Sequence, residues 1–205
     1  MDVRFRVLGL CLLLGLGLPA VPAAAEPQGP QAEAPRPPQR LARPDRRNNI
    51  DFLLGALKAA PDADAAKAIE QRILSLWLVS SSDTANLLMT RAKAAIDEKD
   101  NELAIRLLSA IVEIKPDYVE AWNRRATLYY QQKDYLRAMA DIRQVLAREP
   151  RHFGALAGMG LILQDTGDEK HALEIYRRAL EVNPFLPRIP DLVKSLSEKI
   201  EGRDI

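Results

Sequence analysis

The chain of 205 residues is long enough for one ordinary domain with short appendages and too short for two large domains. Its 29 Lys and Arg residues are balanced by 28 Asp and Glu, so no net charge draws it to nucleic acid or to anionic lipid. Helix-forming residues such as Ala, Leu, Glu and Arg dominate, and aromatic residues make up only 5% of the chain. This composition predicts an all-α protein.

Residues 1–25 have the pattern of a cleaved export signal. A short basic segment precedes an apolar run from Val7 to Leu18, and Ala23–Ala25 supplies the small residues that a signal peptidase accepts. The alternative, a membrane anchor, needs about 20 apolar residues, and this run has only about a dozen. Cys11 follows Leu10, which is not the small residue that precedes a lipoprotein cysteine. We therefore predict a periplasmic mature protein without cysteine or a membrane span.

A proline-rich linker follows over residues 26–47. Six prolines are interleaved with Gln, Ala and Arg, and large apolar residues are almost absent. Such a segment buries too little apolar surface to offset the entropy of ordering, so we expect a disordered spacer. Its five arginines could contact an acidic surface or peptidoglycan, or the segment could act as a solvated tether.

The rest of the chain contains a repeat of 34 residues, marked by Pro116, Pro150 and Pro184. Other positions recur at the same spacing when the prolines are aligned. The recurring sets are Asp100, Asp134 and Asp168; Ala104, Ala138 and Ala172; Ala92, Ala126 and Gly160; Leu88, Trp122 and Leu156; and Ile111, Val145 and Ala179. This period is typical of stacked helix–turn–helix units.

Each recurring position has a physical role in such a unit. Proline ends the second helix, because the residue before it is pushed out of the α region. The recurring Asp follows a tight turn and is placed to cap the second helix. Small residues allow the two helices of a unit to cross closely, and larger apolar residues fill the space between neighbouring units.

These residues resemble the tetratricopeptide repeat (TPR) family. The unit at 119–152 matches the family pattern through Trp122, Ala126, Tyr129, Ala138, Ile142, Val145 and Pro150. The unit at 153–186 matches similarly, and the unit at 85–118 matches more weakly. The resemblance implies a right-handed α-solenoid. With the export signal and linker, it extends to small exported TPR proteins of alphaproteobacteria, which implies a role in cell-envelope integrity through partner proteins.

The flanking segments are predicted to be caps. Residues 48–84 are predicted to form a degenerate pair of helices, at 50–59 and at 63–79, which lies outside the register of the repeat. Residues 187–205 suggest a terminal helix with Ile189, Leu192, Val193, Leu196 and Ile200 on one face and polar residues on the other. An open solenoid needs such a polar outer face at its end.

Nothing in the chain forms a recognisable catalytic or metal-binding pattern. His152 and His171 have no metal-ligand spacing, and the acid pairs lie at turns where helix capping explains them. There is no phosphate-binding glycine loop and no known nucleophile motif. We therefore predict a protein that is not an enzyme and that uses no cofactor and no metal.

A binding surface is expected instead on the concave side, which the first helix of each unit lines in this architecture. By register, the partner-binding residues are Asn86, Met89, Lys93, Glu120, Asn123, Thr127, Tyr130, Gln131, Ala157, Leu161 and Gln164. Some family members hold a peptide carboxylate with Lys, Asn and Arg from three units. Lys93 and Asn123 could supply two of these groups, whereas the third unit is apolar at the matching positions. A hydrophobic or helical segment would therefore suit this surface better.

The predicted function is that of a periplasmic adaptor. It is expected to bind a protein or peptide, namely an envelope protein, and to act as a monomer without nucleic acid. A regulator or accessory subunit of a peptidoglycan enzyme would share all of these features. A structural oligomer stacked end to end would need an apolar face at a terminus, and the polar face of the last helix opposes this at the C-terminal end.

Overall fold

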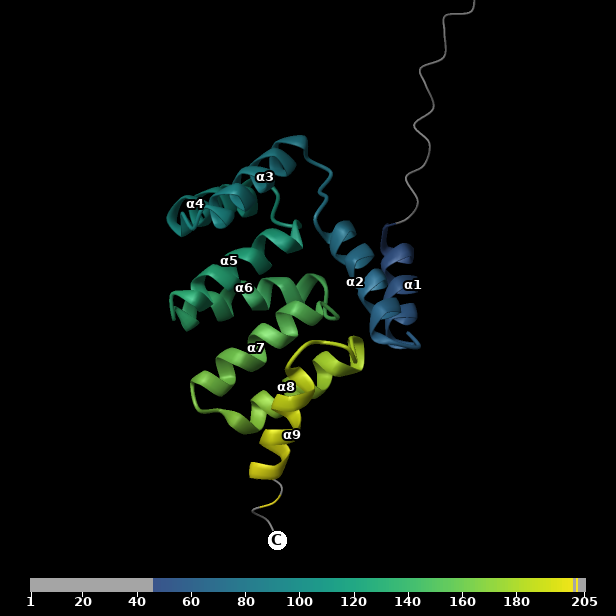
Figure 1. The fold of residues 1–205 in the computed structure, drawn as a ribbon. Coiled ribbons are helices and arrows are strands. Elements are labelled where there is room, and N and C mark those ends of the chain that lie inside the picture. The colour runs from purple at the N-terminus through teal and green to yellow at the C-terminus, as the bar shows by residue number, and fades with distance from the viewer. Residues whose placement is uncertain (1–45, 201, 203–205) are drawn as a thin grey trace, which may run out of the picture. The chain divides into compact units, whose positions relative to one another are not determined.

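The computed structural model describes residues 46–200 and residue 202, and over this range it consists of nine helices joined by short loops (Figure 1). Their bounds are α1 Arg46–Lys58, α2 Ala63–Trp77, α3 Asp83–Asp97, α4 Asn101–Ile114, α5 Val119–Gln131, α6 Tyr135–Arg148, α7 Phe153–Asp165, α8 Glu169–Val182 and α9 Ile189–Ile200. Among these helices, none combines the length and the apolar character needed to cross a bilayer. The predicted signal peptide and linker residues 26–45 lie outside the described range.

Three helix pairs form the repeat predicted from the sequence. The pairs α3–α4, α5–α6 and α7–α8 each pack as a hairpin, and successive hairpins pack through α4 against α5 and through α6 against α7. This is an α-solenoid, in which each unit contacts mainly its neighbours. Helix α3, the first helix of the first repeat, begins at Asp83, two residues before the predicted start of this repeat at residue 85. It begins there because Ser82 is its N-cap and accepts a hydrogen bond from the Ala85 N–H.

The turn inside each repeat has one conformation. The carboxylate that begins the second helix accepts a hydrogen bond from a backbone N–H three residues later, in Asp100, Asp134 and Asp168. The residue before each cap is left-handed, with φ of 65° at Lys99, 59° at Lys133 and 87° at Gly167. The cap N–H bonds back to the fifth residue before it, as in a Schellman motif. The predicted caps are confirmed.

Small residues lie where the paired helices cross. All six of the predicted crossing positions are buried, namely Ala92, Ala126, Gly160, Ala104, Ala138 and Ala172. Ile111, Val145 and Ala179 are also fully buried. Because these positions recur every 34 residues and all are enclosed, the core repeats with the sequence.

A buried ion pair inside the second repeat is linked to the first repeat through a serine hydroxyl, and the sequence pattern did not reveal it. The Arg125 guanidinium donates two hydrogen bonds of 2.8 Å to the Asp141 carboxylate and one of 2.9 Å to the Ser109 hydroxyl. Its central carbon also lies 5.0 Å from the centre of the Trp122 ring. The two partners come from α5 and α6 and the hydroxyl from α4, so one side chain ties three helices together.

The N-terminal helices do not cap the first repeat, which corrects the prediction from sequence. Helix α1 begins at Arg46, inside the predicted linker, and pairs with α2. The apolar side chains of this hairpin join a single core cluster with those of α7, α8 and α9. Trp77 stacks on His152 with ring centres 4.1 Å apart, and the Asn183 amide donates to Glu70 over 2.9 Å. Figure 1 shows α2 beside the later repeats rather than stacked beyond α3 and α4.

The C-terminal helix follows the prediction. Ile189 and Leu196 are buried, and the other residues of the predicted stripe pack against the same core cluster. Helix α9 packs on α8, and Lys199 forms an ion pair with Glu169. The face of the third repeat that would accept a fourth repeat is therefore occupied by α9.

Candidate functional site

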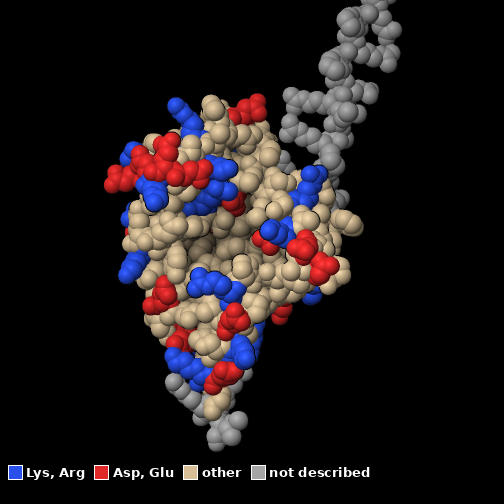
Figure 2. Space-filling model, in the orientation of Figure 1, with Lys and Arg blue, Asp and Glu red and all other residues tan. Residues whose placement is uncertain are grey.

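An apolar pocket lies between α5 and α7 and encloses about 190 Å³. Its lining residues are Asn123, Ala126, Thr127, Tyr130, Ile142, Gly154, Ala155, Ala157, Gly158, Leu161 and Ile162. The space exists because α7 has glycine or alanine at four of the lining positions, where bulkier side chains would fill the gap between α5 and α7. The surface between α5 and α2 is hollowed and mainly uncharged (Figure 2). We call the space lined by these eleven residues the apolar pocket.

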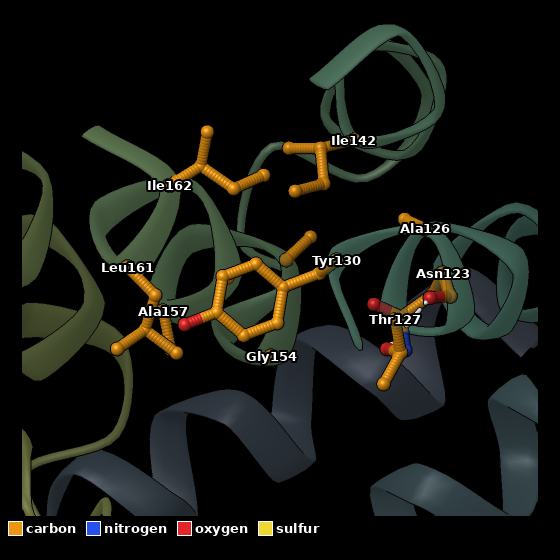
Figure 3. A pocket seen from close by; sticks show the side chains of 11 residues that line it. Asn123, Ala126, Thr127, Tyr130, Ile142, Gly154, Ala157, Leu161 and Ile162 are labelled. Carbon is orange, nitrogen blue, oxygen red and sulfur yellow. Dashed lines mark hydrogen bonds between the residues drawn. The ribbon is translucent and has the colours of Figure 1, made fainter. Parts of the chain in front are cut away.

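The Tyr130 ring forms one wall of the apolar pocket. In Figure 3 it lies between Ala157 and Leu161 of α7 and the polar side chains of Asn123 and Thr127. Its hydroxyl donates a hydrogen bond of 2.9 Å to Asp165, which also accepts one of 3.2 Å from Tyr135. Burial and this hydrogen bond raise the pKa of Tyr130 to about 12. The ring is therefore anchored before any ligand arrives.

A second, more polar groove lies between α3 and α5. It encloses about 480 Å³ and is lined by Leu78, Val79, Asn86, Met89, Thr90, Lys93 and Arg124. Arg124 is already paired with Glu120 over 2.9 Å, whereas the Lys93 ammonium has no ion pair within the described residues. We call this the basic groove, because its two charged lining residues are cations. It can attract a carboxylate, and Lys93 is the cation free to do so.

Glu120 has a structural role instead of the predicted binding role. It is buried, and its carboxylate accepts hydrogen bonds from Asn123 over 3.1 Å and from Arg124 over 2.9 Å. His152 Nε2 lies 3.5 Å from the same carboxylate. Because Glu120 is held by these neighbours, it orients the side chains of the pocket rim and does not meet a ligand itself.

His152 is likewise structural. Its Nδ1 accepts a hydrogen bond of 3.1 Å from the Ala155 N–H, so this atom carries no proton and the imidazole caps α7. The ring is buried under Trp77. A buried ring with one nitrogen used as a cap has no access to a substrate. In the part of the chain that the structure describes, no group of three His, Cys, Asp or Glu could hold a metal ion.

The structure brings together most, but not all, of the predicted partner-binding residues. Those in the apolar pocket are Asn123, Thr127, Tyr130, Ala157 and Leu161, and those in the basic groove are Asn86, Met89 and Lys93. Met89 is largely buried and contributes mainly to the core. Gln131 and Gln164 line neither space, and Gln164 accepts a hydrogen bond from the Tyr176 hydroxyl instead.

Sequence reasoning missed the residues that form the depth of the pocket. Ile142 comes from the second helix α6, and Ala155 and Ile162 were assigned no role in binding. The run of small residues Gly154, Ala157 and Gly158 is the signal in the sequence for this space, but by register alone it indicates only that the third repeat lacks cations there. Sequence reasoning also missed Arg124 as a lining residue of the basic groove, because its position in the repeat does not indicate where its long side chain points.

Sequence models described as tetratricopeptide repeat match residues 119–152 and 153–185. A TPR repeat-containing protein of Rhizobium etli is 42% identical over 164 residues, which is 80% of either chain. A small glutamine-rich TPR-containing protein of Saccharomyces cerevisiae is 25% identical over 95 residues, 46% of this chain and 28% of its own.

Solved structures show the same fold. The first TPR domain of Spaghetti (RPAP3) bound to the HSP90 peptide SRMEEVD superposes with a TM-score of 0.56 at 18% identity, covering 59% of this chain and 96% of that one. The TPR2B domain of yeast Sti1, in a complex with pHsp70, gives 0.53 at 18% identity, covering 58% and 99%. The predicted fold, a right-handed α-solenoid of helix–turn–helix repeats, is confirmed.

Proposed function

The chain belongs to the tetratricopeptide repeat family, and from this premise we propose that it is a non-enzymatic adaptor of the bacterial cell envelope that binds a protein segment in the apolar pocket. TPR domains are protein-interaction modules, and the similar domains of RPAP3 and Sti1 are named in complexes with an HSP90 peptide and with pHsp70. The observation that carries the proposal is the apolar pocket between two first helices, open to solvent and walled by an anchored tyrosine.

The size of the pocket indicates what it binds. An apolar cavity of about 150 Å³ holds a benzene ring, so the 190 Å³ of this pocket suits one large side chain such as Phe or Leu. Asn123 and Thr127 at the rim offer polar groups to a peptide backbone. Binding such an apolar anchor in a desolvated pocket is how peptide interfaces concentrate their affinity.

The neighbouring basic groove indicates the direction of the bound segment. Lys93 belongs to the first repeat, so an acidic residue of the ligand would be placed there while its apolar anchor lies in the pocket between the second and third repeats. The third repeat has Gly154, Ala157 and Gly158 at the pocket, where a three-repeat carboxylate clamp needs cations. The proposed ligand is therefore a segment with one large apolar anchor and an acidic neighbour.

The envelope location rests on residues 1–25. A basic start, the apolar run from Val7 to Leu18 and the small residues Ala23–Ala25 support export with cleavage after Ala25. Fractionation of cells that produce the chain with a C-terminal tag tests this. We expect a periplasmic product beginning at Glu26. A cytoplasmic product that retains its first residues would contradict the location and leave the binding site untouched.

A pull-down from periplasmic extract tests the binding site. Thr127→Trp places an indole in the pocket from an exposed position, and Ala140→Trp adds the same side chain on an exposed position of α6. We expect an envelope protein to be captured by the wild type and by Ala140→Trp, and to be lost with Thr127→Trp. Equal capture by all three would move the site out of the pocket, for example to the linker.

The identity of the captured protein separates the two functions predicted from the sequence. A peptidoglycan enzyme whose activity changes on adding the chain would make the chain an accessory subunit. A captured envelope protein without such a change would make it an adaptor. In either case, replacing the apolar anchor of the captured segment by alanine should weaken binding about tenfold or more.

A further inference from the structure

The first repeat has an open groove on its outer side, between α3 and α4. It is lined by Arg91, Ala94, Ala95, Glu98, Leu103 and Leu107. Leu87 continues this face by one turn of α3 and is 62% exposed. We call these residues together the open groove.

The same groove is filled in the next two repeats. Moving 34 residues along the chain from Leu87 leads to Ala121, which is 0% exposed, and then to Ala155, which is 1% exposed. Leu128 and Ile162, the counterparts of Ala94, are buried as well. These positions are covered by the second helix of the preceding repeat, since α4 packs on α5 and α6 on α7. The groove is therefore a surface built to receive a helix.

Nothing within the described chain covers the groove of the first repeat. The α1–α2 hairpin precedes α3 in sequence but packs with α7, α8 and α9. At the other end, α9 occupies the outer face of the third repeat. A second copy therefore cannot add its first repeat to the third repeat of this one, and head-to-tail stacking is excluded.

The charges of the open groove are complementary to themselves. Leu87, Arg91, Ala94 and Glu98 follow the i, i+4, i+7, i+11 spacing of one helix face. Neither Arg91 nor Glu98 has an ion-pair partner among the described residues. If two copies of α3 lie antiparallel about a two-fold axis that passes midway between the levels of Ala94 and Ala95, Arg91 of each copy faces Glu98 of the other. The small side chains at the axis allow the helices to approach closely.

We propose that the open groove is the interface of a two-fold symmetric homodimer. Each copy covers Leu87, Leu103 and Leu107 of the other and supplies one half of two Arg91–Glu98 ion pairs. A two-fold interface uses the same patch on both subunits and closes on itself, so it forms a dimer and no fibre. This dimer replaces the monomer expected from the sequence. The dimer contains two apolar pockets, one in each copy. The proposal of a dimer does not depend on which ligand these pockets bind.

Sedimentation equilibrium of the protein purified as it accumulates in cells tests the proposal. We expect a concentration-dependent dimer. Arg91→Glu or Glu98→Arg alone should raise the dimer dissociation constant about tenfold or more, because like charges then meet across the axis. The double variant Arg91→Glu/Glu98→Arg should return to the wild-type value, since it restores both pairs with the signs exchanged.

Two leucine variants control for nonspecific effects. Leu87→Lys should prevent dimerisation, whereas Leu136→Lys, at an 84% exposed position on α6, should leave it unchanged. Circular dichroism confirms that each variant is folded. A wild type that stays monomeric up to high micromolar concentration would overturn the proposal. So would a dimer that tolerates Leu87→Lys or that fails to recover in the double charge exchange.

Discussion

The crossing of α7 and α8 allows a test of the proposed packing with two glycines of one helix. A Cβ atom added to Gly160 would lie 2.3 Å from Tyr176 Cε1, 2.5 Å from Cδ1 and 3.0 Å from Cζ. The Tyr176 ring is fully buried, and its hydroxyl donates a hydrogen bond of 2.8 Å to Gln164. A Cβ added to Gly158, two residues earlier, would meet only Ile142 Cδ1 at 3.5 Å. Gly160→Ala should therefore destabilise the fold, and Gly158→Ala should not.

The magnitude follows from two opposing effects. Replacing glycine by alanine inside a helix stabilises it by about 1 kcal/mol. Carbon atoms pack at about 3.5–4.0 Å, so Gly160→Ala must move the Tyr176 ring or its helix by more than about 1 Å. Such overpacking costs about 1–3 kcal/mol or more. Because the helix preference is common to both variants, Gly160→Ala should be about 1–3 kcal/mol less stable than Gly158→Ala.

Urea unfolding followed by circular dichroism at the helix band measures the two free energies of unfolding. In a chain of this size, a difference of about 1 kcal/mol corresponds to about 2–4 °C in Tm. The second repeat has Ala126 and Ile142 at the equivalent positions. Gly160→Ala/Tyr176→Ile should therefore be more stable than the sum of its single changes predicts. If Gly160→Ala is as stable as Gly158→Ala, the crossing described here is wrong.

Three further changes test other parts of the fold. Ala138→Leu overpacks a fully buried crossing and should cost about 1–3 kcal/mol in urea unfolding, against less than about 0.5 kcal/mol for Ala140→Leu at an exposed position. Asp141→Ala leaves the Arg125 guanidinium largely buried without its carboxylate and should cost about 3–5 kcal/mol; a loss below about 1 kcal/mol would contradict its role as a tie between helices. The pKa of Tyr130 rises from 10.0 to about 12 on folding, so its contribution to stability is complete below pH 10 and is lost as the pH rises through 12. The stability difference between wild type and Tyr130→Phe should therefore shrink over that range, and a difference independent of pH would refute the contact.

Arg137, next to Ala138, shows a limit of sequence reasoning. From the sequence alone, Arg137 would be a neutral exposed position. The structure pairs it with Asp134 and places its guanidinium 4.5 Å from the centre of the Tyr129 ring. Replacing Arg137 would remove both contacts, so Ala140 is the better control. Exposure can be predicted from register, whereas the direction of a long side chain cannot.

The sequence by itself determined the repeat. The turns and caps depend on residues within five positions of one another, as at Lys99 and Asp100, so the 34-residue pattern contains the information needed to form them. The small residues at crossings and the terminal prolines are equally local. Each unit packs on a neighbour built in the same way. These local features are therefore enough to predict the solenoid and which residues lie on the first helix of each repeat.

Only the tertiary structure decided where the remaining surfaces meet. Helix α2 buries Ala66, Ile73 and Trp77. Such an apolar face shows that one side of the helix must be covered, but it does not specify the surface that covers it. The stacking of Trp77 on His152 joins residues far apart in the chain and depends on the path of the loop before α3. With this contact, the α1–α2 hairpin packs on the third repeat, and His152 is buried beside Glu120. The groove of the first repeat is therefore left uncovered. Long-range packing of this kind is set by the fit of whole surfaces, which no periodicity in one segment contains.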